Sequence, residues 1–158
     1  MKKNYFQLFK SITTLIYDFD GVMTDNSFFQ DTEGNEIVRL NRSDGYAIKI
    51  LKEKGFIQII LSAEKNDVVK KRAEKIEIPA YTGVLNKACK LKELAIECNF
   101  SLDKSVYVGN EINDLEAMKL CRVGIAPKDS CKEIIEIADI ILKSNGGEGV
   151  IRELLELI

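Results

Sequence analysis

Short apolar runs rich in β-branched residues alternate with longer amphipathic stretches along most of the chain. The apolar runs predict buried strands, and they span residues 13–17, 56–61, 105–109, 123–126 and 140–142. Residues 79–83 predict a further short strand or turn. The amphipathic stretches predict helices, and they span residues 43–55, 66–76, 87–98, 112–120, 130–137 and 149–158. This alternation predicts an α/β fold, a mainly parallel sheet with helices on both faces in a single domain.

Polar residues between the first two strands predict a hairpin and a helix start. Residues 27–30 and 36–40 flank a loop that contains Gly34-Asn35, a pair typical of a β-hairpin. Ser43 and Asp44 predict the cap of the following helix, which Gly55 should end.

The first strand ends in Asp18-Phe19-Asp20-Gly21. Two residues apart on an extended backbone, Asp18 and Asp20 should leave the same face, at the sheet edge where α/β proteins collect their chemistry. Converging carboxylates repel each other unless a cation or a proton lies between them. An oxygen-rich site of this kind suits Mg²⁺. The alternative is a strand that simply ends in a polar turn.

Composition narrows the classes of function. At 158 residues, 46% apolar, with a net charge of −2 and a pI near 5.4, the chain shows no basic surface for nucleic acid or membrane. It has no histidine, and its four cysteines form no CxxC pair, which excludes a Cys/His zinc site, a Ser-His-Asp triad and a histidine phosphatase. Cys89 and Cys98 are expected to be buried thiols. The N-terminal residues lack a signal-peptide core or membrane span, so we expect a reduced, cytoplasmic protein.

DFDGVMTD, residues 18–25, resembles the first motif of the haloacid dehalogenase (HAD) superfamily, whose members are mostly phosphohydrolases. Three further motifs follow in the expected order: Ser62 after the second core strand, Lys87 in GVLNK, and VGNEIND at 108–114. The chain is most similar to a small, capless branch that dephosphorylates 2-keto-3-deoxy sugar acids. That branch includes octulosonate 8-phosphate and nonulosonate 9-phosphate phosphatases and a domain fused to acylneuraminate cytidylyltransferases. Only a hairpin and one helix separate the first motif from residue 61, so we expect no cap domain and an open site.

The resemblance implies a role for each motif residue. Asp18 would attack phosphorus to form an aspartyl-phosphate. Asp20 would protonate the leaving alkoxide and then deprotonate the attacking water. Ser62 would hydrogen-bond the phosphoryl group, although a serine at this position is often only a helix cap. Lys87 would neutralise the nucleophile and the phosphoryl group, whereas a lysine at a helix start is ordinarily exposed.

The resemblance also implies a Mg²⁺ site made by the Asp18 side chain, the Asp20 carbonyl and the 110–114 loop. Asn110 stands where the commonest pattern has Asp, and its neutral amide should hold the ion more weakly. Glu111 and Asp114 are the remaining acidic candidates. Thr24 and Asp25 are expected to cap and orient the first-motif loop.

Five residues resemble substrate-reading positions of this branch: Arg42, Asp44, Glu64, Arg72 and Lys75. Arg42 could pair with a sugar-acid carboxylate. Glu64, with Arg72 and Lys75 following, resembles the nonulosonate phosphatases. The alternatives are an ordinary exposed arginine and a solvated basic helix.

We therefore expect a Mg²⁺-dependent phosphatase of a phosphorylated 2-keto-3-deoxy sugar acid. The segment 146–153, with the pattern Gly-Gly-x-Gly-x-x-Arg-Glu, resembles one that lies near a neighbouring subunit's site, which implies a homotetramer whose subunits cover one another's open sites. The alternative is that its three glycines are only a flexible connector. Two alternatives remain. The chain could be a catalytically weak partner of a sialic-acid-type cytidylyltransferase, which Asn110 favours and Asp18, Asp20 and Lys87 oppose, or a broad-specificity sugar phosphatase.

Overall fold

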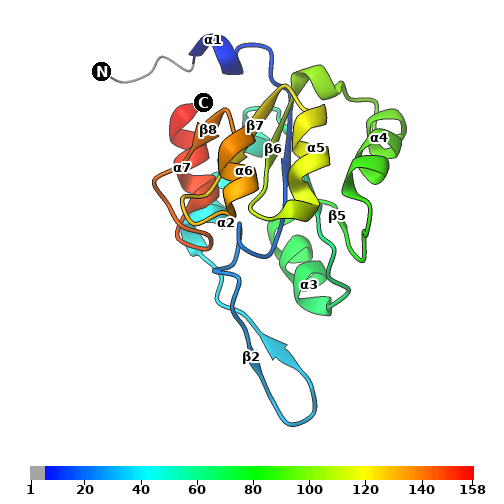
Figure 1. Ribbon diagram of the computed structural model, residues 1–158, viewed down its shortest axis with the longest axis vertical. Helices are drawn as coiled ribbons and strands as arrows, with labels where there is room; N and C mark the ends of the chain where they lie inside the picture. Colours follow the sequence, from blue (N-terminus) through cyan, green and yellow to red (C-terminus); the bar gives the residue numbers. More distant parts are fainter. Residues whose placement is uncertain (1–5) are drawn as a thin grey trace.

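A computed structural model describes residues 6–158, while residues 1–5 of the N-terminal segment lie outside it. At its centre is a six-stranded sheet in the order β5-β4-β1-β6-β7-β8, in which every neighbouring pair is parallel (Figure 1). The strands are β1 Thr14–Tyr17, β4 Ile57–Leu61, β5 Ala80–Tyr81, β6 Ser105–Val108, β7 Val123–Ala126 and β8 Ile140–Ile141. The predicted parallel α/β fold is confirmed.

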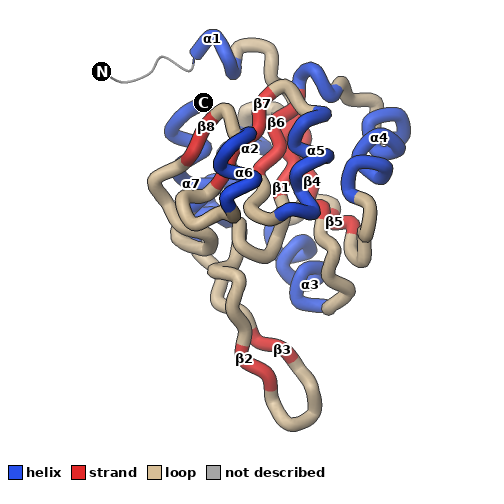
Figure 2. Tube along the Cα trace, in the orientation of Figure 1, coloured by secondary structure: helices blue, strands red, loops and turns tan. Residues whose placement is uncertain are grey.

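Helices cover both faces of the sheet, which gives three layers (Figure 2). One apolar cluster joins the sheet to α2, α3 and α7, and a second joins it to α4, α5 and α6. The helices are α1 Phe6–Phe9, α2 Arg42–Glu53, α3 Asp67–Ile76, α4 Lys87–Glu97, α5 Leu115–Leu120, α6 Lys132–Ile137 and α7 Val150–Leu157, with 3₁₀ turns η1 Leu102–Lys104 and η2 Ile112–Asp114.

Strand β1 lies at the point where the chain reverses its direction across the sheet. The chain adds β4 and β5 on one side of β1 and then crosses over to build β6, β7 and β8 on the other. Thr14 accordingly pairs with Ile57 on one side and Ser105 on the other. In open α/β sheets such a switch point leaves a crevice beyond the carboxyl ends of the strands, and ligands bind there.

Alternation along β1 decides which layer the first motif faces. Leu15 and Tyr17 pack in the cluster with α2, α3 and α7, whereas Ile16 packs in the cluster with α4, α5 and α6. Because successive side chains alternate across a strand, Asp18 continues the Ile16 side. The first aspartate is thereby directed toward the N-terminal ends of α4 and α5.

The predicted hairpin is confirmed as β2 Phe29–Gln30 and β3 Glu36–Ile37, which are antiparallel and project from the body of the molecule (Figures 1 and 2). Asp31 organises its loop, since Asp31 Oδ1 accepts from the backbone N–H groups of Glu33 and Asn35. Between β1 and β4 the structure has only this hairpin and α2, so the predicted absence of a cap domain is confirmed as well.

Two local predictions are wrong. Helix α2 is capped by Asn41, whose Oδ1 accepts from Ser43 N at 2.8 Å, rather than by Ser43 or Asp44. Cys89 and Cys98 are exposed thiols, because the buried side of α4 is made by Lys87, Leu91 and Leu94.

No helix within residues 6–158 combines the length and apolarity that crossing a membrane requires.

Candidate active site

The loop after β1 is held by its own polar groups. Asp18 N donates to Val108 O at 2.9 Å, which extends the β1–β6 ladder by one residue. The chain then turns at Gly21, whose φ of +80° suits glycine. Thr24 Oγ1 accepts from the N–H groups of Gly21 and Asn26 and lies 3.3 Å from Asp20 Oδ1. Thr24 therefore orients this loop, as predicted.

Asp25 also orients the loop. Its Oδ1 accepts from Ser27 N at 3.1 Å and Ser27 Oγ at 2.6 Å, and its Oδ2 lies 3.2 Å from Arg39. The prediction for Asp25 is confirmed.

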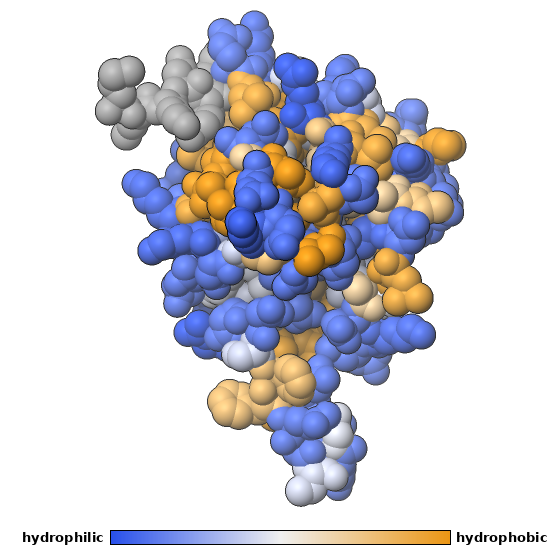
Figure 3. All heavy atoms as spheres, in the orientation of Figure 1, coloured by the Kyte–Doolittle hydropathy of each residue, from blue (hydrophilic) through white to orange (hydrophobic). Residues whose placement is uncertain are grey.

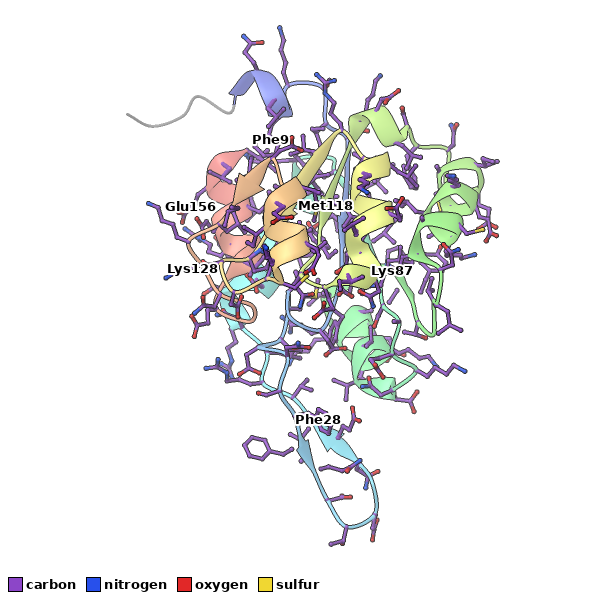
Figure 4. All side chains as sticks on the ribbon, viewed as in Figure 1. Phe9, Phe28, Lys87, Met118, Lys128 and Glu156 are labelled. Carbon is purple, nitrogen blue, oxygen red and sulfur yellow. The ribbon has the colours of Figure 1, made fainter. Side chains whose placement is uncertain are left out.

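Lys87 joins two buried carboxylates. Its Nζ lies 2.7 Å from Asp18 Oδ1 and 2.6 Å from Asp114 Oδ1, and the lysine side chain has no exposed surface. Asn86 starts α4 with its Oδ1 accepting from Cys89 N, and so brings Lys87 into the first turn, beside the carboxyl ends of the strands (Figure 4). Lys87 is therefore not the ordinary exposed lysine of a helix start, and it lies where the motif resemblance implied.

Asp114 is a structural anchor in this arrangement. Its Oδ1 accepts from Lys87 and Tyr107, and its Oδ2 accepts from the backbone N–H groups of Asn110 and Glu111. The side chain is fully buried. All these bonds come from the protein, so the prediction that Asp114 binds the metal is replaced by a role in holding Lys87 and the 110–111 backbone.

Tyr107 is a site residue that the sequence reasoning missed. It is fully buried on β6, and its hydroxyl donates to Asp114 Oδ1 at 2.8 Å. The available signal was the alternation of side chains along the strand, which places Tyr107 on the face of the sheet opposite to that of Val106 and Val108. The polar tip of a buried tyrosine also needs a partner.

Replacing Tyr107 by phenylalanine should lower kcat roughly tenfold with little change in KM, because Asp114 would lose one donor and draw Lys87 away from Asp18. The matched control is Tyr17→Phe. Tyr17 is equally buried, but its hydroxyl donates to Gln58 Oε1 at 2.9 Å in the opposite layer. Steady-state kinetics on both variants would test this. Equal loss of kcat in the two variants would show that Tyr107 acts only on the fold.

The charges of the site follow from burial and pairing. Burial alone would lower the pKa of Lys87, but Asp18 and Asp114 outweigh it and raise that pKa, so Lys87 is a cation at neutral pH. Burial, and then Asp114, raise the pKa of Asp18, while Lys87 opposes them. Burial raises the pKa of Asp20 and the Thr24 hydrogen bond opposes it. A raised carboxyl pKa suits a residue that must hold and release a proton.

Asp20 also has a free oxygen. Within residues 6–158, its Oδ2 is buried and has no hydrogen-bond partner. Such an atom is free to exchange a proton with a bound ligand.

Three oxygens can converge beside Asp18. One terminal atom of the Asn110 amide lies 3.2 Å from Asp18 Oδ2 and 2.9 Å from the Asp20 carbonyl oxygen. If that atom is nitrogen, it donates to both oxygens. If it is oxygen, its two separations, from Asp18 Oδ2 and from the Asp20 carbonyl oxygen, are close to the roughly 3 Å expected between neighbouring ligands of an octahedral Mg²⁺ at about 2.0–2.1 Å. The residues present therefore fit Mg²⁺.

This oxygen set is mostly neutral. Among the described residues no three His, Cys, Asp or Glu side chains converge as a metal site, so the set depends on the Asn110 amide and a backbone carbonyl. Gly21 lets the amide approach, since a side chain there would overlap it. Glu111 does not join the set. It is exposed and its Oε1 accepts from Ile112 N in the turn of η2, which corrects its prediction as a metal ligand.

Ser62 follows β4 directly and is 1% exposed. Its Oγ accepts from Glu64 N at 3.2 Å, and its own N–H donates to Tyr81 O. The cap of α3 is Asn66, so Ser62 is not that helix cap. Parallel pairing of β1 with β4 brings Ser62 to the same sheet edge as Asp18.

The C-terminal glycine segment contacts the first-motif loop of the same chain. Gly147 N donates to Val22 O at 2.9 Å, and a Cβ on Gly147 would lie 2.6 Å from Asp25 N. A Cβ on Gly146 would collide with the Gly21 carbonyl. Both glycines therefore allow their backbone to pack against the backbone of residues 21–25, a contact that the sequence reasoning did not anticipate.

Two of the predicted substrate-binding residues, Asp44 and Arg72, lie near each other and make none of the contacts that join Asp18, Lys87 and Asp114. Asp44 is 2% exposed, and its Oδ1 accepts from Arg152 N at 2.9 Å, so it caps the first turn of α7. Arg72 Nη2 donates to Asn41 O at 3.1 Å. Asp44 and Arg72 attract each other electrostatically. The structure thus corrects the prediction for Asp44, which joins α2 to α7.

Asp44 should make stability depend on pH. Burial raises its pKa to about 6, above about 3.9 in an unfolded chain, so the folded protein binds the proton more tightly. Stability from this residue is present below about pH 4 and is lost as pH rises through 6. Relative to Asp44→Asn, the native chain should gain about 1.4 kcal/mol between pH 7.5 and 5. Urea unfolding at both pH values measures this gain. A constant difference would show that Asp44 does not titrate in this range.

The other predicted substrate residues are exposed. Arg42 lies in the first turn of α2 and Lys75 in the last turn of α3. Glu64 lies near enough to Asp20 to raise its pKa by charge, as does Glu36 from the hairpin. Glu36 is also bonded to the cap residue of α3, through Asn66 Nδ2 at 2.8 Å. Two carboxylates, Glu36 and Glu64, therefore lie near Asp20, and Glu36 is one that the sequence reasoning missed.

Comparison with known proteins agrees with this geometry. Residues 3–154 match the family of haloacid dehalogenase-like hydrolases. The 3-deoxy-D-manno-octulosonate 8-phosphate phosphatase of Haemophilus influenzae is 27% identical over 153 residues, which cover 96% of this chain and 85% of the relative.

Two solved structures show the same fold. The enzyme of that name from Moraxella catarrhalis, in complex with magnesium, phosphate and KDO, is 27% identical with a TM-score of 0.94, over 99% of this chain and 91% of the other. The cobalt-bound Haemophilus influenzae enzyme is 26% identical with a TM-score of 0.91, over 96% and 89%. The chain belongs to the haloacid dehalogenase-like hydrolases.

Proposed function

We propose that this protein is a Mg²⁺-dependent phosphatase of a phosphorylated 2-keto-3-deoxy sugar acid. The observation that carries the proposal is the buried Asp18–Lys87 pair, 2.7 Å apart, beside the oxygens of Asp20 and Asn110. A phosphate monoester is an anion, so a carboxylate can attack it only where charge is neutralised and geometry is fixed. Lys87 and a cation on the three oxygens meet that requirement.

The chain's own residues would carry out two displacements. The Asp18 carboxylate donates an electron pair to phosphorus, the bond to the sugar oxygen breaks, and Asp20 gives that oxygen its proton. Asp20 then takes a proton from water, which attacks the aspartyl-phosphate and releases phosphate, restoring the Asp18 carboxylate. Lys87 and Ser62 would hold the phosphoryl oxygens. Mg²⁺, held by Asp18, the Asp20 carbonyl and Asn110, would supply Lewis-acid charge neutralisation when bound.

The substrate class comes from the relatives and the outer residues. Proteins similar to this chain are named for 3-deoxy-D-manno-octulosonate 8-phosphate. Glu64, close to Asp20, is the feature that favours a nonulosonate 9-phosphate instead. Arg42 and Lys75 are the exposed cations available for a sugar-acid carboxylate.

Phosphate release from a panel of substrates tests this proposal. The panel contains octulosonate 8-phosphate, two nonulosonate 9-phosphates and simple hexose phosphates, each with and without Mg²⁺. Metal-dependent release that is selective for one keto-acid phosphate is expected. Uniformly slow release would favour a broad-specificity phosphatase. No release from folded protein would favour the catalytically weak partner of a cytidylyltransferase.

We also propose that the chain forms a homotetramer in which neighbouring subunits cover the open sites. The hairpin projects from the body, and Phe28, Phe29 and Ile37 on it are 55%, 79% and 63% exposed. Figure 4 shows Phe28 pointing away from the molecule, and Figure 3 shows apolar side chains where the hairpin leaves the body. Large apolar side chains gathered on a protruding element are typical of an interaction surface.

Replacing Phe28 and Phe29 together by serine should lower the molar mass in solution, measured by light scattering on a sizing column. Ile96→Ser is the matched control, because Ile96 is 83% exposed on α4, away from the hairpin. A native chain that is already monomeric would contradict the assembly itself. A double variant of unchanged mass would exclude the hairpin as its contact.

A further inference from the structure

The oxygens proposed to hold Mg²⁺ carry little net charge. Asp18 is the only carboxylate among the three groups, and its Oδ1 is already 2.7 Å from Lys87 Nζ. Asp20 contributes a backbone carbonyl and Asn110 a neutral amide. Since Mg²⁺ loses its water reluctantly, a set with one shared negative charge holds it weakly.

A phosphoryl group that binds beside Lys87 would find too little positive charge. Lys87 is the buried cation of the site, and both Asp18 and Asp114 lie within 2.7 Å of its Nζ. Two carboxylates against one ammonium leave a negative balance before any ligand enters. Glu36 and Glu64 add negative charge near Asp20. A phosphate dianion that entered without a metal would therefore meet like charge at short range in a poorly solvated place.

We infer that Mg²⁺ and the phosphoryl group bind this site as a mutually dependent pair. Because Asn110 is neutral, the protein supplies too little negative charge to hold Mg²⁺ alone, and the phosphoryl group supplies the rest. Mg²⁺ in turn supplies the positive charge that the phosphoryl group lacks. The inference rests on the proposed function and deepens it. A carboxylate at position 110 would supply the missing negative charge to Mg²⁺ permanently. With Asn110, the dianionic ligand supplies it, so the protein holds the metal tightly only when a phosphoryl group is present.

Thermodynamic linkage makes this inference measurable without turnover. If phosphate lowers the Kd of Mg²⁺ by some factor, Mg²⁺ must lower the Kd of phosphate by the same factor. We expect that factor to be roughly tenfold or more. Isothermal titration of Mg²⁺ into the native protein, with and without saturating inorganic phosphate at constant ionic strength, gives the first value. The reverse titration of phosphate, with and without Mg²⁺, gives the second.

Two variants separate the role of Asn110 from general charge. Asn110→Asp should tighten Mg²⁺ binding in the absence of phosphate and reduce the coupling factor. Asn99→Asp adds the same charge at an exposed position just beyond the end of α4 that lies away from Lys87, and it should leave both values as in the native chain. Equal effects of the two variants would attribute the coupling to net charge and not to the amide beside Asp18.

The outcomes distinguish this inference from the proposed function. Mg²⁺ that binds with the same Kd with and without phosphate overturns the coupling and leaves the phosphatase proposal intact. Mg²⁺ that binds under neither condition overturns both. A factor of roughly tenfold in both titrations, reduced in Asn110→Asp alone, supports the inference.

Discussion

Asp18→Asn should reduce phosphate release by roughly 10⁴-fold or more while leaving the protein folded. An amide cannot form the aspartyl-phosphate, so the two-step route is closed. Stability should hold, because Lys87 keeps Asp114 as its partner at 2.6 Å and one of two like charges in the buried cluster is removed. Initial rates on the best substrate of the panel measure the loss, and circular dichroism follows the fold.

Asp103→Asn is the control for Asp18→Asn, since Asp103 is exposed in η1 at the opposite end of β6. It should retain the native rate. Mass spectrometry of quenched protein should detect a phosphorylated species in the native chain and none in Asp18→Asn. Near-normal turnover by Asp18→Asn would remove Asp18 from the mechanism, whatever the state of the metal.

The sequence predicted the layers of the fold because they depend on local periodicity. Buried strands and amphipathic helices have different spacings of apolar residues, and the parallel sheet followed from their alternation. The resemblance to the motifs predicted that Asp18, Ser62 and Asn110 lie in one site. The structure places the Asn110 amide beside Asp18, and it places Ser62 at the same sheet edge, because each of these residues follows a parallel strand. Lys87 joined them through its motif spacing.

The wrong predictions concern residues whose environment depends on tertiary contacts, which the spacing of apolar residues along the sequence does not reveal. Asp44 was predicted to cap α2 and to bind substrate, but it bonds to the backbone of Arg152, 108 residues away. Cys89 and Cys98 follow a helical pattern whose covered side is set only by packing. Asp114 is acidic and lies in a metal motif, yet four donors from the protein take up its oxygens. Residue type alone does not show which acceptors are already used.

Removing the charge of Lys87 should have the largest effect on stability. Lys87→Met keeps the length and apolar stem of the side chain but leaves Asp18 and Asp114 buried without their cation. Breaking a buried pair in this way costs roughly 3–5 kcal/mol. The variant should also lose measurable turnover, because the nucleophile and the phosphoryl group would repel each other. Urea unfolding at pH 7 measures the free energy of unfolding.

Two further variants show whether that loss comes from the unpaired charges. Lys90→Met removes a lysine of the same helix that pairs with Glu93 near the surface, and it should change stability by less than about 1 kcal/mol. Adding Asp114→Asn to Lys87→Met should recover part of the lost stability, because one of the two stranded carboxylates is removed. It should not recover turnover. If Lys87→Met unfolds at the native urea concentration, the two carboxylates do not depend on Lys87, and the charge balance argued for this site is wrong.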